Sequence, residues 1–309
     1  MTDRRRCWRT GVASAWLALS LSATAATELA PAVYAQLGDN AAIAPANDGN
    51  IANSGFIITE TSVIVVDTGI SYRAGVALLQ AIEARAAKPI AAVVLTHPVQ
   101  EFIFGAAAFQ EGGAPVTMHR DAVALMLRRC NNCLRKLTNL LGSARMAGSR
   151  VITPDRVLTD SMTLQIGGRE IDLIALGQAS APGDLVVLDR RSGTLFGGGV
   201  VLAQRLPNLR DGDIGHWIEA LEFLKSLPFR RIVPGIGPIC GADCVDAELD
   251  YLRQLQAAVS EQYQSGASLI ETINRVRLPE FSGVNQYEAL HAQNVQYVYR
   301  QLEDADLRR

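Results

Sequence analysis

Short apolar runs, each ending in a polar turn, set the pattern of the early part of the chain. Runs of this length rich in β-branched residues are typical of buried strands, and apolar residues three and four apart are typical of helices. A strand, a helix ending at Lys88-Pro89 and a second strand, in this order, predict a βαβ unit with a parallel pair of strands. The predicted elements are strands at 55–58, 63–66 and 90–95 and a helix at 74–87.

The rest of the chain alternates hairpins with longer helices. Gly167-Gly168 and Arg191-Ser192-Gly193 each separate two apolar runs and therefore predict β-hairpins. Strands outnumber helices early and helices close the chain, so we expect two sheets covered by helices in one α/β (α+β) domain spanning residues 26–309. The further predicted elements are hairpins at 162–174 and 185–196, strands at 115–118 and 231–233, and helices at 104–109, 121–141, 217–227, 245–264 and 286–302.

The composition is typical of a globular protein and excludes one class of binding partner. The 309 residues are 49% hydrophobic and 19% charged, which is ordinary for a globular protein with a sizeable core. The net charge is -2, and no block of basic residues lies in the part that is expected to fold. Because nucleic-acid binders need a basic footprint, we exclude nucleic acid as a partner.

Residues 1–25 have the pattern of a signal peptide. Arginines at 4, 5, 6 and 9 precede an apolar run at 12–21, which is too short to span a bilayer, and Ala23-Thr24-Ala25 has the small residues of a cleavage site. We therefore expect a periplasmic or secreted protein with no membrane anchor after cleavage. The paired arginines leave both ordinary secretion and twin-arginine export open.

Four cysteines follow the signal segment: Cys130, Cys133, Cys240 and Cys244. An even number in an exported chain favours structural disulfides, with three possible connectivities that the sequence does not separate. A redox pair at Cys130 and Cys133, or a metal site of four thiolates, is the alternative. No histidine follows Cys133, so the usual pattern of covalent haem attachment is absent.

The segment at 93–105 carries the main candidate chemistry. An apolar strand ends in Thr96-His97, and Glu101 opens the following helix. His97 and Glu101 are candidates for a metal ligand and a general base, respectively. The alternative is structural: a histidine held by a neighbouring carboxylate or carbonyl, and a glutamate stabilised by the helix dipole.

Seven short motifs occur in order along the chain: Asn53-Ser54-Gly55-Phe56, Val66-Asp67-Thr68-Gly69, Thr96-His97, Gly105, Ala181-Pro182-Gly183-Asp184-Leu185, Leu195-Phe196-Gly197-Gly198 and Val233-Pro234-Gly235. In this order they resemble the metallo-β-lactamase superfamily over the whole mature chain. The resemblance implies a four-layer αββα sandwich with metals on loops at one edge of two facing sheets. Ser71-Tyr72-Arg73 and the segments 130–134 and 291–295 are similar to its exported branch, the quinoprotein relay system zinc metallohydrolases.

The chain departs from that family at nearly every ligand position. The family uses a Thr-His-x-His-x-Asp-His loop, a later histidine, a bridging aspartate and a last histidine, and only His97 matches. Catalytic zinc needs about three protein ligands and an open position, whereas His97 and Glu101 supply two at most. We therefore predict no metal and a site filled by apolar side chains, with a small pocket at the small residues. The replaced positions are Val99, Glu101, Phe102, Ser180, Gly199 and Ile236.

Four residues of the matching motifs are expected to stabilise turns through local backbone hydrogen bonds. They are Asp67, Gly69, Gly183 and Asp184.

The leading functional hypothesis is an exported pseudoenzyme that serves as a binding or accessory protein. The branch resemblance implies an association with a periplasmic quinoprotein dehydrogenase or its cytochrome partner. One alternative is a metal-dependent hydrolase of a lactone, ester or thioester, which would require zinc. A second alternative is a thiol-redox protein acting through Cys130 and Cys133.

Overall fold

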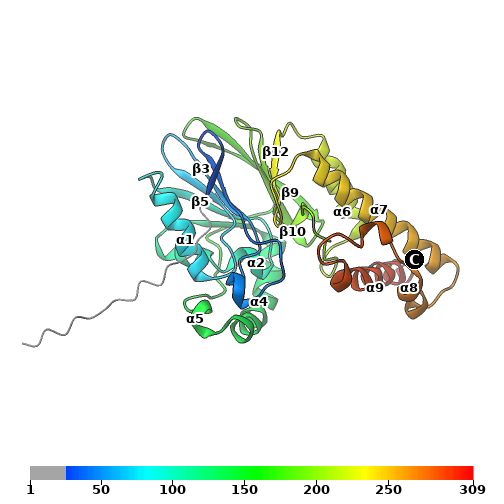
Figure 1. Cartoon of the computed structure of the whole chain (residues 1–309). Helices are drawn as coiled ribbons and strands as arrows, with labels where there is room; N and C mark the ends of the chain where they lie inside the picture. Colours follow the sequence, from blue (N-terminus) through cyan, green and yellow to red (C-terminus); the bar gives the residue numbers. More distant parts are fainter. Residues whose placement is uncertain (1–25, 309) are drawn as a thin grey trace, which may run out of the picture.

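The computed structural model describes residues 26–308, so the predicted signal peptide lies outside the described residues. Two sheets form the centre of the molecule, with helices outside them (Figure 1). The first sheet has seven strands in sequence order: β1 (Thr27–Ala30), β2 (Val33–Gln36), β3 (Ser54–Ile58), β4 (Val63–Val66), β5 (Ile90–Leu95), β6 (Val116–His119) and β7 (Arg156–Leu158). The second has five, in the order β12 (Arg231–Val233), β11 (Thr194–Phe196), β10 (Pro182–Asp189), β9 (Arg169–Gln178) and β8 (Met162–Ile166).

The helices fall into two groups along the chain. The first group is α1 (Tyr72–Glu83), α2 (Gln100–Ile103), α3 (Ala106–Glu111), α4 (Arg120–Leu141) and α5 (Ser143–Met146). The second is α6 (Ile214–Lys225), α7 (Ala242–Gln264), α8 (Leu269–Arg275) and α9 (Tyr287–Asp306). Short 3-10 turns occur at Pro45–Asn47, Gly198–Val200 and Pro279–Phe281.

The predicted local units are confirmed. β4 and β5 pair in parallel across α1, which is the expected βαβ unit. β8 pairs antiparallel with β9, and β10 pairs antiparallel with β11, so both hairpins form. α4 and α7 begin within three residues of the predicted starts.

Buried apolar residues form three clusters. These lie between the four layers of the fold, which are helices, the first sheet, the second sheet and helices. One cluster lies between the sheets and joins Ile57 and Val94 of the first to Leu173 and Val187 of the second. A second packs the outer face of the first sheet against helices that include α1, α3 and α4. A third packs the second sheet against α6, α7 and α9, with Trp217 buried in it. The mixed α/β prediction with two facing sheets is therefore confirmed.

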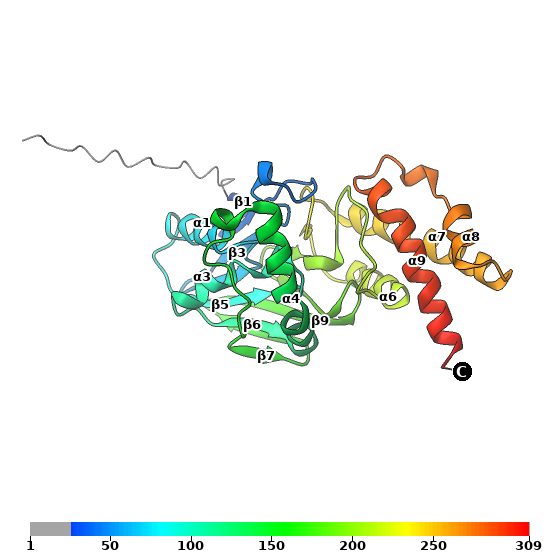
Figure 2. The ribbon, with the colours of Figure 1, turned by 90° about the horizontal axis from the view of Figure 1, so that it is seen from below.

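The C-terminal helices form an extension on the outer side of the second sheet. Figures 1 and 2 show α7, α8 and α9 grouped together, with α7 running alongside α6. Tyr251 of α7 and Asn294 of α9 are joined by a buried hydrogen bond of 3.0 Å. No helix within residues 26–308 has the length and apolar character needed to cross a membrane.

Candidate functional site

A cavity of about 530 Å³ opens beside the turn that follows β5. The turn and α2 form one wall, α4 forms a second, and the loop after Gly199 closes the third. The sequence predicts a site filled by apolar side chains with a small pocket at Ser180 and Gly199, and both of these residues line the cavity. Ser180 and Gly199 are small, and the face of α4 that lines the cavity carries the long polar side chains of Arg128, Arg129 and Lys136.

His97 is held by a buried carboxylate at the inner end of this cavity. Its Nδ1 lies 2.6 Å from Oδ1 of Asp184, and the two residues are 6% and 0% exposed. The other oxygen of Asp184 accepts hydrogen bonds from the Ser180 hydroxyl at 2.8 Å and from the backbone N–H groups of Ser180 and Ala181 at 2.7 and 2.9 Å. Both oxygens of this buried carboxylate are therefore bonded inside the protein.

The surroundings of His97 stabilise its protonated form. Burial alone would lower the pKa of His97, but the charge and hydrogen bond of Asp184, together with the charges of Glu101 and Asp67, outweigh it. The net result is a pKa of His97 above its usual value. The carboxylate of Asp184 occupies Nδ1 of the ring, which leaves Nε2 as the ring nitrogen that faces away from this contact.

Asp67 fixes the residue that precedes His97. It sits in a left-handed turn with φ of 56°, and its two oxygens accept from the backbone N–H and the hydroxyl of Thr96 at 2.9 and 2.7 Å. Burial raises the pKa of Asp67 to about 7, although both hydrogen bonds from Thr96 act to lower it.

The two predicted turn glycines are also in left-handed conformations, with φ of 83° at Gly69 and 79° at Gly183. At Gly183 a Cβ atom would lie 2.5 Å from the backbone nitrogen of Ala122, so α4 approaches this turn closely.

Apolar groups surround the histidine ring at the positions where the family carries ligands. Phe102 meets the ring edge to face at 5.4 Å between centroids. A Cβ atom on Gly199 would lie 2.4 Å from Nδ1 of His97, so the ring packs directly on that glycine. Phe102 and Ile236 are buried, Val99 is half-buried, and none of the three carries a donor atom for a metal.

These residues do not fit a catalytic zinc ion. Within residues 26–308 no three or more His, Cys, Asp or Glu side chains are grouped so that they could hold a metal. Glu101 lines the cavity from the first turn of α2, but among these residues it forms no ion pair or hydrogen bond with His97. Zinc chemistry of the family type needs about three protein ligands, and this corner supplies at most two.

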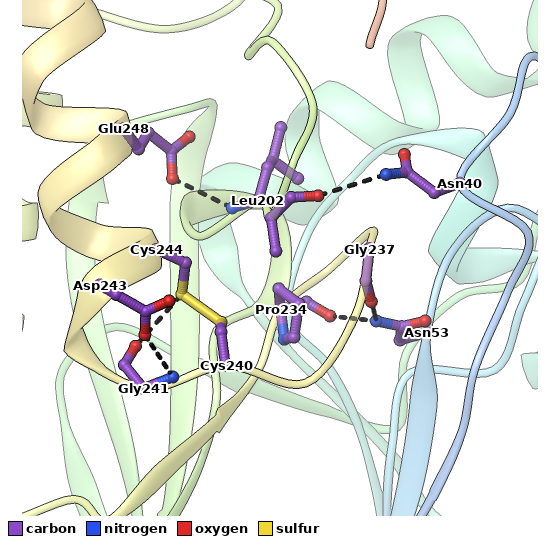
Figure 3. Close-up of a disulfide and its surroundings, with 11 residues drawn as sticks. Asn40, Asn53, Leu202, Pro234, Gly237, Cys240, Gly241, Asp243, Cys244 and Glu248 are labelled. Atoms are coloured by element: carbon purple, nitrogen blue, oxygen red, sulfur yellow. Dashed lines mark hydrogen bonds between the residues drawn. A yellow bond between two sulfur atoms is a disulfide. The ribbon is translucent and has the colours of Figure 1, made fainter. Parts of the chain in front are cut away.

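Two tethers hold the loops that carry Leu202 and Ile236 against the cavity (Figure 3). Asn53 donates to the carbonyls of Pro234 and Gly237 at 2.7 and 2.9 Å. Glu248 of α7 accepts from the backbone N–H of Leu202 at 3.0 Å, and burial raises the pKa of this carboxyl well above its usual value.

The cysteines divide into one disulfide and two thiols. Cys240 and Cys244 form a disulfide that links the end of the β12 loop to the first turn of α7, as Figure 3 shows. The disulfide prediction is confirmed for this pair. Cys130 and Cys133 are free thiols on one face of α4 and line the cavity. The alternative of four thiolates around one metal is wrong, because two of the four sulfurs are bonded to each other.

Sequence reasoning missed a group of basic residues in the outer part of the cavity. Arg128, Arg129 and Lys136 of α4 line it, together with Arg205 and Arg210 from the loop opposite. The spacing of Arg129 and Lys136 was a usable signal, because seven residues are about two turns of a helix and so place both on one face. The loop arginines gave no such signal, because only the tertiary fold brings them to α4.

Comparisons with known proteins agree with the architecture. The sequence model of the Metallo-beta-lactamase superfamily matches residues 47–236. A metallo-beta-lactamase type 2 from Bacteroides fragilis is 27% identical over 113 residues, which cover 35% of this chain and 45% of that protein. The chain thus matches less than half of that relative's length.

Solved structures with low identity share the fold. A metallo-beta-lactamase from Pontibacter korlensis has a TM-score of 0.61 and 22% identity, covering 74% of this chain and 98% of its own. A stereoselective inverting sec-alkylsulfatase from Pseudomonas sp. has a TM-score of 0.69 and 17% identity, covering 90% of this chain and 50% of its own. At these identities the likeness concerns the fold alone.

Proposed function

The chain belongs to the metallo-β-lactamase superfamily, and we propose that it is a member without a working metal centre, which serves as an exported binding or accessory protein. In this proposal the loops of the family's active site are retained, but the site serves for binding. Its cavity receives a partner group or a small molecule, and the chemistry of a metal-bound water is not performed.

The set of side chains around His97 carries this proposal. His97 has one ring nitrogen bonded to Asp184, and the hydroxyl of Ser180 donates to the same carboxylate. Val99, Phe102, Gly199 and Ile236 offer no side-chain lone pairs, so His97 and Glu101 are the remaining donors at the family's ligand positions. Two donors fall short of the roughly three protein ligands that, together with an open position for water, lower the pKa of a zinc-bound water to near neutrality.

The partner and the compartment are proposed from the resemblance to the quinoprotein relay branch. The Ser71-Tyr72-Arg73 segment and the segments 130–134 and 291–295 support a periplasmic location and a quinoprotein dehydrogenase or cytochrome as partner. Affinity capture of the tagged mature protein from a periplasmic extract that contains a quinoprotein dehydrogenase tests this. We expect the dehydrogenase or its cytochrome in the eluate, and the repeated absence of both would contradict the proposal.

Elemental analysis of the purified mature protein tests the loss of the metal centre. We expect well under one zinc per chain, and no difference between the wild type and His97→Ala. Stoichiometric zinc that disappears in His97→Ala would contradict the proposal. Zinc-dependent hydrolysis of a lactone, ester or thioester, abolished by the same variant, would establish the rival hydrolase function.

A further inference from the structure

The wall of the cavity opposite His97 holds a pair of thiols that the proposed function does not use. Cys130 and Cys133 are three residues apart on α4 and both line the cavity. Cys130 is buried and its Sγ lies 3.4 Å from the carbonyl oxygen of Pro98, in the turn after His97. Cys133 is half-buried and more accessible from the cavity. This is the arrangement of an attacking thiol with a second thiol behind it.

The groups around Cys133 favour its thiolate. The neighbouring Cys130 thiol, together with the charges of Arg129 and Arg210, lowers the pKa of Cys133 to about 6, while burial and the charge of Glu101 act in the opposite direction. In its protonated form Cys133 donates to the carbonyl oxygen of Arg129 at 3.5 Å. The proximity of Cys133 and burial raise the pKa of Cys130. Cys133 is therefore the thiol of the pair that ionises more readily, and Cys130 is the one that stays protonated.

The cavity around the thiols carries more positive than negative charge. Asp211 is ion-paired with both Arg129 and Arg210. Among residues 26–308, Arg128, Lys136 and Arg205 line the cavity without an ion pair of their own. Arg205 donates only to neutral oxygens, those of Ala41 at 3.0 Å and Asn40 at 3.5 Å. Glu101 is the one cavity-lining carboxylate that remains to offset these three cations.

We propose that Cys130 and Cys133 form a thiol–disulfide exchange site whose substrates are small anionic disulfides, drawn into the cavity by Arg128, Lys136 and Arg205. The Cys133 thiolate attacks one sulfur of the disulfide, forms a mixed disulfide and releases one thiolate. Cys130 then gives up its proton, which passes through solvent to a released thiolate. The resulting Cys130 thiolate attacks Sγ of Cys133 in the mixed disulfide and expels the second thiolate of the substrate. One S–S bond is broken, one is formed, and two electrons pass from the dithiol to the substrate.

Helix geometry makes the resulting Cys130–Cys133 bridge easy to reverse. Side chains three residues apart on a helix have Cβ atoms about 5–6 Å apart, whereas a relaxed disulfide needs about 3.5–4.5 Å. Closing the bridge must therefore distort one turn of α4, and a distorted disulfide is more readily reduced. Cys240–Cys244 differs, because Cys240 lies before α7 and the loop there can adapt.

Oxidised glutathione is a suitable probe because it is a disulfide with net negative charge. The full mature protein is gently reduced, mixed with the probe and analysed by differential alkylation with mass spectrometry. We expect Cys130 and Cys133 to be lost as free thiols together and to appear as one linked peptide. Cys130→Ser should accumulate a glutathione adduct at Cys133. Free thiols at both positions after prolonged exposure, or adducts without the internal bridge in the wild type, would overturn the proposal.

Charge-neutralising variants on the exposed surface of α4 test the substrate class without risk to the core. Arg128→Gln and Lys136→Gln should each slow the reaction with oxidised glutathione about threefold and leave the neutral hydroxyethyl disulfide unaffected. Arg135→Gln is the matched control, because Arg135 is exposed on α4 but does not line the cavity. Equal rates in all three variants, or faster reaction of the wild type with the cationic disulfide cystamine, would overturn the preference for anions.

Discussion

The two sides of the cavity differ in how their polar groups are satisfied. On the His97 side, the imidazole, the carboxylate of Asp184 and the hydroxyl of Ser180 bond to one another and to the backbone. On the α4 side, Arg128 and Lys136 are exposed and form no ion pair among the described residues, and two thiols face the same space. On the first side the Asp184 carboxylate and the Ser180 hydroxyl are bonded within the protein, whereas the second side has cations and thiols available to a ligand.

This difference separates stability from binding. Removing a member of a buried, fully bonded group leaves its partners buried and unsatisfied, which costs stability. Removing an exposed cation leaves nothing unsatisfied, so it changes only what the cavity attracts. Substitutions on the His97 side should therefore reduce the free energy of unfolding, and those on the α4 side should alter reaction rates.

Asp184→Ala should have the largest effect on stability. It leaves His97 without its carboxylate and removes the acceptor of two backbone N–H groups and the Ser180 hydroxyl, at a cost of about 3–5 kcal/mol in the free energy of unfolding. Urea unfolding followed by circular dichroism measures it. Arg128→Gln is the control from the other side of the cavity. Equal losses of unfolding free energy in the two variants would contradict the proposed difference between the two sides.

Asp67→Asn should change how stability depends on pH. The pKa of Asp67 rises from 3.8 to about 7 on folding, so between these values the folded protein holds a proton that the unfolded chain lacks. Stability therefore falls as pH rises through this window. The raised pKa of His97 acts in the same direction, because its contribution is full below its unfolded pKa and is lost above its folded one.

The asparagine is neutral at every pH and keeps an oxygen to accept from Thr96. Between pH 4 and pH 8 the free energy of unfolding should fall by up to about 4 kcal/mol less in the variant than in the wild type. The part of the pH dependence that comes from His97 should remain. Urea titrations across this range measure the change. Identical slopes in the two proteins would show that Asp67 does not titrate in this window.

Gly199→Ala should be smaller in effect but specific to the His97 side. The new Cβ would lie 2.4 Å from Nδ1 of His97, so the ring must shift away from Asp184, at a cost of about 1–3 kcal/mol. Gly283→Ala is the matched control, because no atom lies within 4 Å of a Cβ at that position. Thermal unfolding of both variants measures the difference, and a Gly199→Ala protein as stable as the control would argue against tight packing here.

Local patterns predicted the fold well, because each element carried its own signal. The βαβ unit over β4, α1 and β5 and the hairpin at Gly167-Gly168 follow from the spacing of apolar residues and from turn glycines. β1 and β2 were missed, since strands of four residues that include Pro31 in their connection have little pattern to read.

The site was predictable only where its residues follow one another in the sequence. His97 and Glu101 belong to one segment, and the family motif supplied the positions of Ser180, Gly199 and Ile236. The pairing of His97 with Asp184 joins residues 87 positions apart. The basic residues in the outer part of the cavity come from α4 and from a loop that is distant in the sequence. Such contacts depend on how the two sheets and α4 pack, which no local pattern encodes.

The most direct test of the central claim is to observe His97 itself while zinc is offered. Two-bond ¹H–¹⁵N spectra of the imidazole, assigned with His97→Ala and recorded on a protein with Ser at Cys130 and Cys133, report the state of both ring nitrogens. The account predicts an Nδ1–H bonded to Asp184 and no change when one equivalent of zinc is added. A zinc-dependent shift of a His97 ring nitrogen would contradict it.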